Sequence, residues 1–105
     1  MSLYIVNVMK KPKALSLKKL DALYEGMLLL ESVKECRSFF RDLCTIGELQ
    51  EMSERFEVVK LVDEGVPYRE IAANTGVSTA TITRVAQWLK NGEGGYRLIL
   101  DRLKK

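Results

Sequence analysis

The sequence contains no histidine and only two cysteines among its 105 residues. Histidine is the commonest general base near neutral pH and a frequent metal ligand, so its absence weakens any enzymatic interpretation. Cys36 and Cys44 match no zinc or redox spacing, and we expect both to be free, buried thiols. No nucleophile stands beside a base, and no phosphate-cradling loop is present. The sequence therefore predicts a protein that is not an enzyme, without catalytic residues or a metal site.

Long apolar runs are also missing, because no stretch approaches the roughly 18 apolar residues of a membrane span. The segment 3–9 is apolar, but it is too short for a signal peptide, and its lysines follow it rather than precede it. We therefore expect a cytoplasmic protein without a membrane partner. The hydrophobic fraction of 47% argues against a disordered chain, and 105 residues suit one domain with a modest core.

The net charge is only +3, but the charged residues are unevenly distributed. Residues 1–20 carry five lysines and no acid, whereas residues 21–65 carry five bases and eleven acids. Residues 66–92 carry three bases and one acid, and residues 93–105 carry four bases and two acids. An acidic middle followed by a basic stretch suits a protein that presents one face to phosphate. Because the basic excess is small, we expect DNA binding by a dimer rather than by one chain.

Apolar periodicity and capping residues predict an all-α chain with six helices. Ser16 begins the first helix, and the capping boxes Ser32–Glu35 and Thr45–Glu48 begin the next two. The expected helices cover about 16–30, 32–43, 45–64, 67–72, 78–91 and 96–103. We interpret residues 16–105 as one domain. Residues 1–15 form an N-terminal arm, which is either a disordered terminus or a basic segment that adds phosphate contacts.

The predicted helices carry more apolar surface than a small monomer needs. The first has a broad apolar face that runs from Leu17 to Leu30, and the second is expected to bury one side. The short last helix is too apolar for a solvated tail, so it must pack on another apolar surface. This excess indicates a partner surface. The expected buried side of the second helix consists of Cys36, Phe39, Phe40 and Leu43.

The stretch from Tyr68 to Gln87 has the pattern of a helix-turn-helix, a DNA-reading unit. Ile71 and Ala72 are expected to end a short helix, and Ala72 is small enough for the next helix to cross closely. Gly76 follows where the chain turns sharply, since glycine adopts a left-handed conformation without a Cβ clash. Ser78 is then placed to cap the second helix through its hydroxyl group.

The second helix of this unit has a buried stripe on one side and a polar surface on the other. The stripe has the spacing of a helix that packs on a core: Ile82, Val85, Ala86 and Leu89. The outer side lacks the glutamate and lysine mixture of a solvated helix, which favours a helix-turn-helix at about residues 68–90. An ordinary helical hairpin with a routine glycine cap is the alternative interpretation. The outward residues are Thr79, Ala80, Thr81, Thr83 and Arg84.

From about Ser16 to Lys105 the sequence resembles the Trp repressor family, and within it the bacterial YerC/YecD-type proteins. The segments that carry the resemblance are FFRDLCT, ELQEMSERFEVVKLVDEG, YREIA and STATITRV, and the most specific part is ATITR. The resemblance implies a six-helix fold in which an intertwined homodimer carries the helix-turn-helix. Such a dimer presents two recognition helices to successive major grooves about 34 Å apart, and so binds a palindromic site on double-stranded DNA.

The resemblance also implies roles for individual residues. Arg69 matches an arginine that contacts a guanine edge, and a bidentate contact of this kind contributes roughly 1–3 kcal/mol of discrimination. Three other positions lie at the start of the recognition helix, where contacts can run through water, and two suit phosphate contacts or capping. The alternative for the hydroxyl side chains is exposure to solvent without a role. The three positions at the helix start are Thr79, Ala80 and Thr83, and the two that suit phosphate contacts or capping are Ser78 and Thr81.

Tryptophan-binding members of the family hold the amino acid with two arginines and a threonine. The matching residues in this sequence are Thr45, Arg55 and Arg84, so an anion-holding trio is retained. The alternative role for the two arginines is ion pairing with the acidic third helix, for example with Glu51 or Glu48. On either interpretation these three residues are the candidate effector site.

Two replacements argue against an effector in that site. Val85 stands where the family has a glycine, and Trp88 stands where a small serine is expected. We expect the Trp88 indole to fill the cavity that the ligand would occupy. The sequence therefore predicts weak or absent binding of L-tryptophan, or of another small anionic effector, and no cofactor.

The sequence as a whole predicts a sequence-specific transcriptional regulator, and specifically a repressor that occludes a promoter as a homodimer. The expected partners are double-stranded DNA and a second copy of the chain. The alternative is a helical dimer that uses the helix-turn-helix to dock a protein partner such as RNA polymerase. The two differ in salt dependence, because only binding through several phosphates weakens steeply as salt rises.

Overall fold

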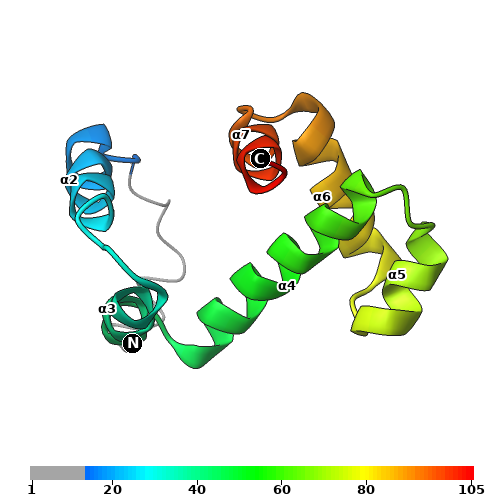
Figure 1. Cartoon of the computed structure of the whole chain (residues 1–105), viewed down its shortest axis with the longest axis horizontal. Helices are drawn as coiled ribbons and strands as arrows, with labels where there is room; N and C mark the ends of the chain where they lie inside the picture. Colours follow the sequence, from blue (N-terminus) through cyan, green and yellow to red (C-terminus); the bar gives the residue numbers. More distant parts are fainter. Residues whose placement is uncertain (1–13) are drawn as a thin grey trace, which may run out of the picture. The chain divides into compact units, whose positions relative to one another are not determined.

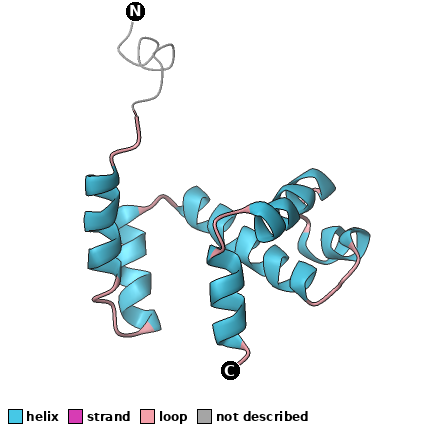
Figure 2. Cartoon of the chain, turned by 90° about the horizontal axis from the view of Figure 1, so that it is seen from above, coloured by secondary structure: helices cyan, strands magenta, loops and turns pink. Residues whose placement is uncertain are grey.

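The computed structural model describes residues 14–105, which form six helices and no strand (Figure 2). The prediction of an all-α chain is confirmed over this range. None of these helices is both long and apolar enough to cross a membrane. The predicted arm, residues 1–15, lies almost wholly outside the described residues. The helices are α2 (Leu17–Met27), α3 (Val33–Leu43), α4 (Ile46–Asp63), α5 (Tyr68–Thr75), α6 (Thr79–Asn91) and α7 (Gly95–Leu103).

The described chain divides into two units, one that ends at Phe39 and one that runs from Phe40 to Lys105. The first contains α2 and most of α3, and neither helix has a buried residue within the single chain. The predicted buried side of α3 is therefore wrong for one chain on its own, since Leu43 is 49% exposed. The prediction of one domain over residues 16–105 stays a prediction.

Local side-chain caps begin the helices at the predicted residues. The Ser16 hydroxyl accepts a hydrogen bond from the Lys19 amide at 3.3 Å and so begins α2. The capping box of α4 is complete: the Glu48 amide donates to Thr45 Oγ1 at 3.1 Å, and the Thr45 amide donates to Glu48 Oε1 at 2.8 Å. The hydrogen bonds from Thr45 lower the pKa of Glu48, because they stabilise its carboxylate.

Two details in and beside α3 differ from the prediction: the donor to the Glu35 carboxylate, and the burial of the two cysteines. Ser32 caps the helix, since its hydroxyl accepts from the Glu35 amide at 3.1 Å. The Glu35 carboxylate, however, accepts from the amide of Glu31 at 2.9 Å, one residue before the donor of a standard capping box. Cys36 and Cys44 are free as predicted, but both are half-buried rather than buried. Cys36 lies in α3 and Cys44 directly follows it, and α3 has no buried residue within the single chain.

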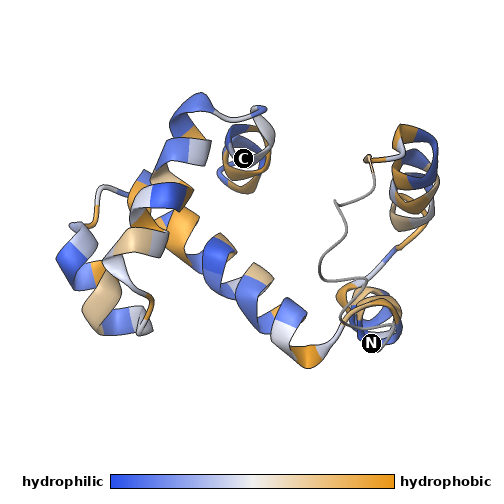
Figure 3. Ribbon diagram, turned by 180° about the vertical axis from the view of Figure 1, so that it is seen from behind, coloured by the Kyte–Doolittle hydropathy of each residue, from blue (hydrophilic) through white to orange (hydrophobic). Residues whose placement is uncertain are grey.

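The core of the second unit lies where α4, α5 and α6 pack against one another, and α7 adds to it through α6 (Figure 1). Figure 3 shows apolar residues gathered on the C-terminal half of α4, beside α6. Complete burial of an aliphatic side chain contributes about 1.5–3 kcal/mol. The predicted buried stripe of α6 is confirmed, with Leu89 half-buried at its end. The buried side chains are Val58, Val59, Ile71, Ile82, Val85, Ala86 and Leu100.

The turn between α5 and α6 depends on two adjacent residues. Gly76 has a φ of +75° and donates its N–H to the Ala72 carbonyl at 2.9 Å. The Thr75 hydroxyl donates to the Ile71 carbonyl at 2.7 Å and accepts from the Val77 amide at 3.2 Å. These contacts extend α5 as far as Thr75. The prediction that Ile71 and Ala72 end the helix is therefore wrong, and both residues lie in its middle.

An ion cluster joins the last helix to the end of α4. Lys104 Nζ donates to Asp63 Oδ2 at 2.6 Å, and Arg97 donates to Asp63 Oδ1. The Asp63 side chain is 12% exposed, whereas Arg97 and Lys104 are 44% and 58% exposed. The hydrogen bond from Lys104, together with the charge of Arg97, holds the pKa of Asp63 below its ordinary value against the opposing effect of desolvation.

Replacement of Gly76 tests the left-handed turn. Gly76→Ala is expected to lower the free energy of unfolding by about 1–2 kcal/mol, because a Cβ is disfavoured in this conformation. No heavy atom lies within 4 Å of the new Cβ, so the cost is conformational rather than steric. Gly76→Asn should cost less, since asparagine visits this region more readily. Urea unfolding measures both variants, and an equal loss for Ala and Asn would contradict this explanation.

The Asp63 cluster predicts a specific acid dependence. A carboxyl group whose pKa is lowered by folding stabilises the protein above its unfolded pKa of about 3.9. That stabilisation is lost as the pH falls through the lower, folded pKa. Asp63→Asn should therefore be less stable than the unmodified chain at pH 7, and the difference should shrink below about pH 4. Asp101→Asn is the matched control, because Asp101 is 55% exposed and contacts Arg97 only at 3.5 Å. A constant difference between pH 7 and pH 3 in urea unfolding would refute the assignment.

Candidate nucleic-acid interface

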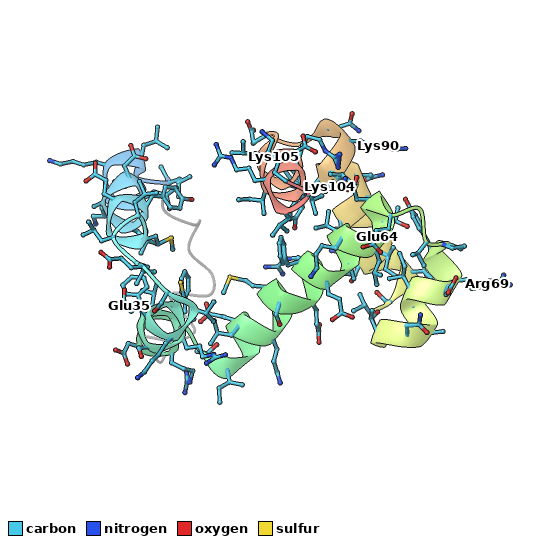
Figure 4. The ribbon with its side chains drawn as sticks, viewed as in Figure 1. Glu35, Glu64, Arg69, Lys90, Lys104 and Lys105 are labelled. Atoms are coloured by element: carbon cyan, nitrogen blue, oxygen red, sulfur yellow. The ribbon has the colours of Figure 1, made fainter. Side chains whose placement is uncertain are left out.

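Arg69 lies in the first turn of α5 and is exposed. Pro67 precedes the helix in an extended conformation and has no amide hydrogen to satisfy. Figure 4 shows the Arg69 side chain extending outward from α5, away from α4. No hydrogen bond or ion pair holds its guanidinium group within residues 14–105. The five N–H donors of this group therefore remain available to a ligand outside the chain.

The first turn of α6 is held by two hydroxyl groups that bond to each other. The Ser78 hydroxyl accepts from the Thr81 amide at 3.2 Å and donates to Thr81 Oγ1 at 3.0 Å. Ser78 is exposed, and Thr81 is half-buried. The cap predicted at Ser78 is confirmed. The second bond, to Thr81 Oγ1, uses the Ser78 hydroxyl hydrogen, so this residue retains only acceptor capacity for an outside partner.

Three further predicted contact residues, Thr79, Ala80 and Thr83, lie on the exposed side of α6. Thr83 Oγ1 donates to the backbone carbonyl of Thr79 at 2.9 Å, so its hydroxyl points back to its own helix. The structure therefore places these residues together on one surface, next to the buried stripe that faces the core. Arg84 is also exposed, on the flank of this surface.

An open hollow of about 990 Å³ lies within the second unit, between the middle of α4, the α5–α6 turn, α6 and the start of α7. Pockets for small molecules commonly have volumes of about 300–1,000 Å³. We refer to this space as the α6 hollow. It is lined by Glu51, Glu54, Arg55, Gly76, Val77, Ser78, Thr81, Arg84, Val85, Trp88, Glu93, Gly95 and Tyr96.

The candidate effector trio is only partly assembled in one chain. Arg55 and Arg84 both line the α6 hollow, whereas Thr45 does not. Thr45 caps the start of α4, about 15 Å along the helix axis from Arg55 at 1.5 Å per residue. No salt bridge joins either arginine to a carboxylate anywhere in the described range, residues 14–105. The alternative prediction of ion pairs with Glu48 or Glu51 is therefore wrong.

Trp88 lines the α6 hollow but does not fill it. Its side chain is 61% exposed, whereas Val85 is only 3% exposed and belongs to the core. The expectation that the indole occupies the cavity is thus wrong for the single chain, because Trp88 lies on the flank of the buried stripe rather than on it. The hollow is also acidic, since three carboxylates line it beside two guanidinium groups. These are the carboxylates of Glu51, Glu54 and Glu93.

Sequence patterns did not identify three residues that shape this region. Thr75 closes the α5–α6 turn through its hydroxyl group. The only feature of the sequence that could have indicated this role is a threonine near a helix end, since its hydroxyl can bond to a preceding carbonyl. Glu93 and Tyr96 line the α6 hollow from the segment after α6. Their placement depends on how α7 packs, which has no local signature in the sequence.

Comparisons with known proteins match nearly the whole described chain. The family model described as "Trp repressor protein" matches residues 18–104. The uncharacterized protein YerC of Bacillus subtilis (strain 168) is 46% identical over 88 residues, which cover 84% of this chain and 85% of that protein. A Trp operon repressor homolog of Chlamydia trachomatis serovar L2 is 30% identical over 84 residues, which cover 75% of this chain and 89% of that protein.

A solved structure supports the same relationship. The crystal structure of a TrpR-like protein from Eubacterium eligens matches with a TM-score of 0.80 and 41% sequence identity. The match covers 83% of this chain and 90% of that chain. The residues of the family match include all of α3 to α7 and all but the first residue of α2. The matched residues therefore include the helix-turn-helix and all the residues that line the α6 hollow.

Proposed function

Because the chain belongs to the Trp repressor family, whose members are DNA-binding regulators and not enzymes, we propose that it represses transcription as a homodimer on a palindromic operator. The family predicted from the sequence is confirmed by the comparisons. The observation that carries the proposal is the exposed surface formed by α5 and α6. This surface presents an unpaired arginine beside a helix face of short side chains, which suits close approach to a DNA groove.

The proposed geometry places α6 in the major groove and α5 across its edge. The major groove is about 12 Å wide and admits one α-helix. The residues on the outer face of α6 are short, so the helix backbone can lie close to the base edges. Arg69 is longer and extends from α5, and its planar fork matches the two acceptors of guanine. These roles for Arg69 and for the outer face of α6 are part of the proposal.

A homodimer accounts for the apolar surface that one chain leaves uncovered. Helices α2 and α3 have 11 residues each and bury no side chain by themselves. Isolated helices of this length are marginal in water, so both need a partner surface. In helix-turn-helix dimers, of which the Trp repressor is a standard example, two-fold symmetry sets half-sites about 34 Å apart. The most exposed apolar residues outside α5 and α6 are Leu15, Leu17, Leu28, Leu29, Val33, Ile46 and Leu103.

We further propose that repression does not require tryptophan. The α6 hollow retains Arg55 and Arg84, but its lining holds one more carboxylate than guanidinium groups. A ligand carboxylate placed there meets like charges as well as opposite ones, which weakens its binding. Trp88 also adds an exposed aromatic ring to the lining, although it leaves the hollow open. The excess of carboxylates is the feature that disfavours a small anionic effector.

Substitution of Arg69 tests the proposed base contact. Arg69→Ala should weaken binding to an operator selected from random DNA by about 1–3 kcal/mol for each half-site. Arg69→Lys keeps the charge but loses the bidentate fork, so it should lose sequence preference while it keeps most non-specific binding. Fluorescence anisotropy with selected and scrambled duplexes separates these effects, and the melting temperature reports whether each variant is folded.

Arg102→Ala is the matched control, because it removes the same charge from an exposed residue of α7. It should change the affinities for selected and scrambled duplexes equally. Binding to the selected duplex should also weaken steeply as salt rises, as several phosphate contacts require. An unchanged operator affinity for Arg69→Ala would contradict its assigned role. A salt-independent affinity would favour the docking of a protein partner instead.

Thermal unfolding tests independence from tryptophan. A ligand that binds only the folded state stabilises it by about 2.7 kcal/mol at one hundred times its dissociation constant. Millimolar L-tryptophan should therefore leave the melting temperature unchanged within a degree if binding is absent. Trp88→Ser is the matched variant, because it restores the small residue expected at this position. A clear rise for the unmodified chain would contradict the proposal, and a rise only for Trp88→Ser would identify the indole as the obstacle.

A further inference from the structure

The N-terminal part of the outer face of α6, residues 79–83, offers few hydrogen-bond donors. Between residues 79 and 83 the exposed positions hold threonine and alanine, and none holds the arginine, lysine, asparagine or glutamine that makes bidentate base contacts. Ala80 presents only a methyl group. This face therefore differs from Arg69 on α5, which carries five donors. Discrimination between bases by residues 79–83, the N-terminal part of α6, must come from other chemistry.

The hydrogen bonds within α6 reduce its donors further. Thr83 donates its hydroxyl hydrogen to the Thr79 carbonyl at 2.9 Å, so its methyl group and one acceptor oxygen remain for a base. Ser78 donates to Thr81 Oγ1 at 3.0 Å and has no hydrogen left to give. Thr79 has no hydroxyl partner within the described residues, so among residues 78–83 it is the exposed side chain with a free donor. The next exposed donors on α6, Arg84 and Gln87, lie further along the helix. Ala80 and Thr83 are three residues apart, so their methyl groups lie side by side on the helix.

Only one base of ordinary DNA carries a methyl group on its major-groove edge. Thymine presents a 5-methyl group beside its O4 acceptor, whereas guanine, cytosine and adenine present donors and acceptors without a methyl group. A helix face made of methyl groups leaves those polar edges without partners when it displaces water from them. Against a thymine methyl group, the same face buries apolar surface on both sides.

We propose that α6 selects thymine in each operator half-site through contacts of the Ala80 and Thr83 methyl groups with the thymine 5-methyl group. This inference rests on the proposed function, because it requires α6 to lie in the major groove. Arg69 then specifies guanine by hydrogen bonds, and α6 specifies thymine by apolar contact. The two helices of the motif thus use different chemistry to recognise different bases.

Replacement of thymine by deoxyuridine tests the inference, because it removes only the methyl group. The operator is first selected from random duplexes with the full-length protein, and each thymine is then replaced in both half-sites at once. At one or two positions, affinity should fall about fourfold for each half-site, which corresponds to about 0.8 kcal/mol for one buried methyl group. Replacement of thymines outside the contacted positions should have no effect.

Two variants of Thr83 separate the methyl group from the hydroxyl group. Thr83→Ser removes the methyl group and keeps the bond to the Thr79 carbonyl, so the ratio of thymine to uracil affinity should fall at one position. Thr83→Val keeps a methyl group and removes the oxygen, so this ratio should persist whatever the absolute affinity. The opposite pattern would overturn the inference, because it would assign recognition to the oxygen, directly or through water.

The outcomes distinguish this inference from the proposed function. If the protein selects no duplex, both are wrong. If it selects a duplex in which every thymine tolerates uracil, or a half-site without thymine, only the thymine inference is wrong. Arg69→Ala serves as the control variant, because it should weaken operator binding while it leaves the thymine-to-uracil ratio unchanged. Circular dichroism confirms that each variant keeps its helices.

Discussion

Burial of Ile71 and Ile82 in one core is the constraint on which the rest of the second unit depends. Both side chains are fully buried, yet they lie on consecutive helices that are only three residues apart. The chain must therefore reverse direction within that short turn. Gly76 permits the reversal through its left-handed conformation, and Thr75 satisfies backbone groups on both sides of it. The angle between α5 and α6 follows from this packing rather than from either helix alone.

The same burial decides which residues face outward. Once Ile82, Val85 and Ala86 face the core, helix geometry places Ala80 and Thr83 on the opposite surface. In its N-terminal part the outer face of α6 then has short, exposed side chains and few free donors, because the Ser78 and Thr83 hydroxyl groups donate within this segment. The core thus fixes the position of this outer face, whose own side chains make few contacts. This division explains how a small unit can hold α6, which we propose reads the DNA, in a fixed position.

The core is small, and it is confined to the second unit. No residue of α2 or α3 is buried in it, and the last helix contributes Leu100, with the half-buried Tyr96 packed against it. The Asp63 cluster compensates in part, since it ties α7 to α4 by charge rather than by burial. Apolar side chains on the remaining surfaces stay exposed in one chain. The structure of the single chain is therefore best understood as half of the homodimer that we propose.

Features with a local cause could be predicted from the sequence. The caps at Ser16, Thr45 and Ser78 and the turn at Gly76 involve residues within a few positions of each other, and the structure places all four as expected. The buried stripe of α6 was also predictable, because helical periodicity alone sorts its residues. The Trp repressor family was identified from short segments for a similar reason, since residues that must meet the same local geometry recur in the same order.

Features that join distant residues were decided only by the tertiary structure. Asp63 and Lys104 are 41 residues apart and meet because α7 packs beside the end of α4. The exposure of Trp88, the unpaired state of Arg55 and Arg84, and the separation of Thr45 from both arginines depend on the packing of α4 against α6 and α7. A sequence determines which residues share a helix face, because that depends on helix geometry. Which faces meet, and what remains open between them, depends on packing across the whole chain.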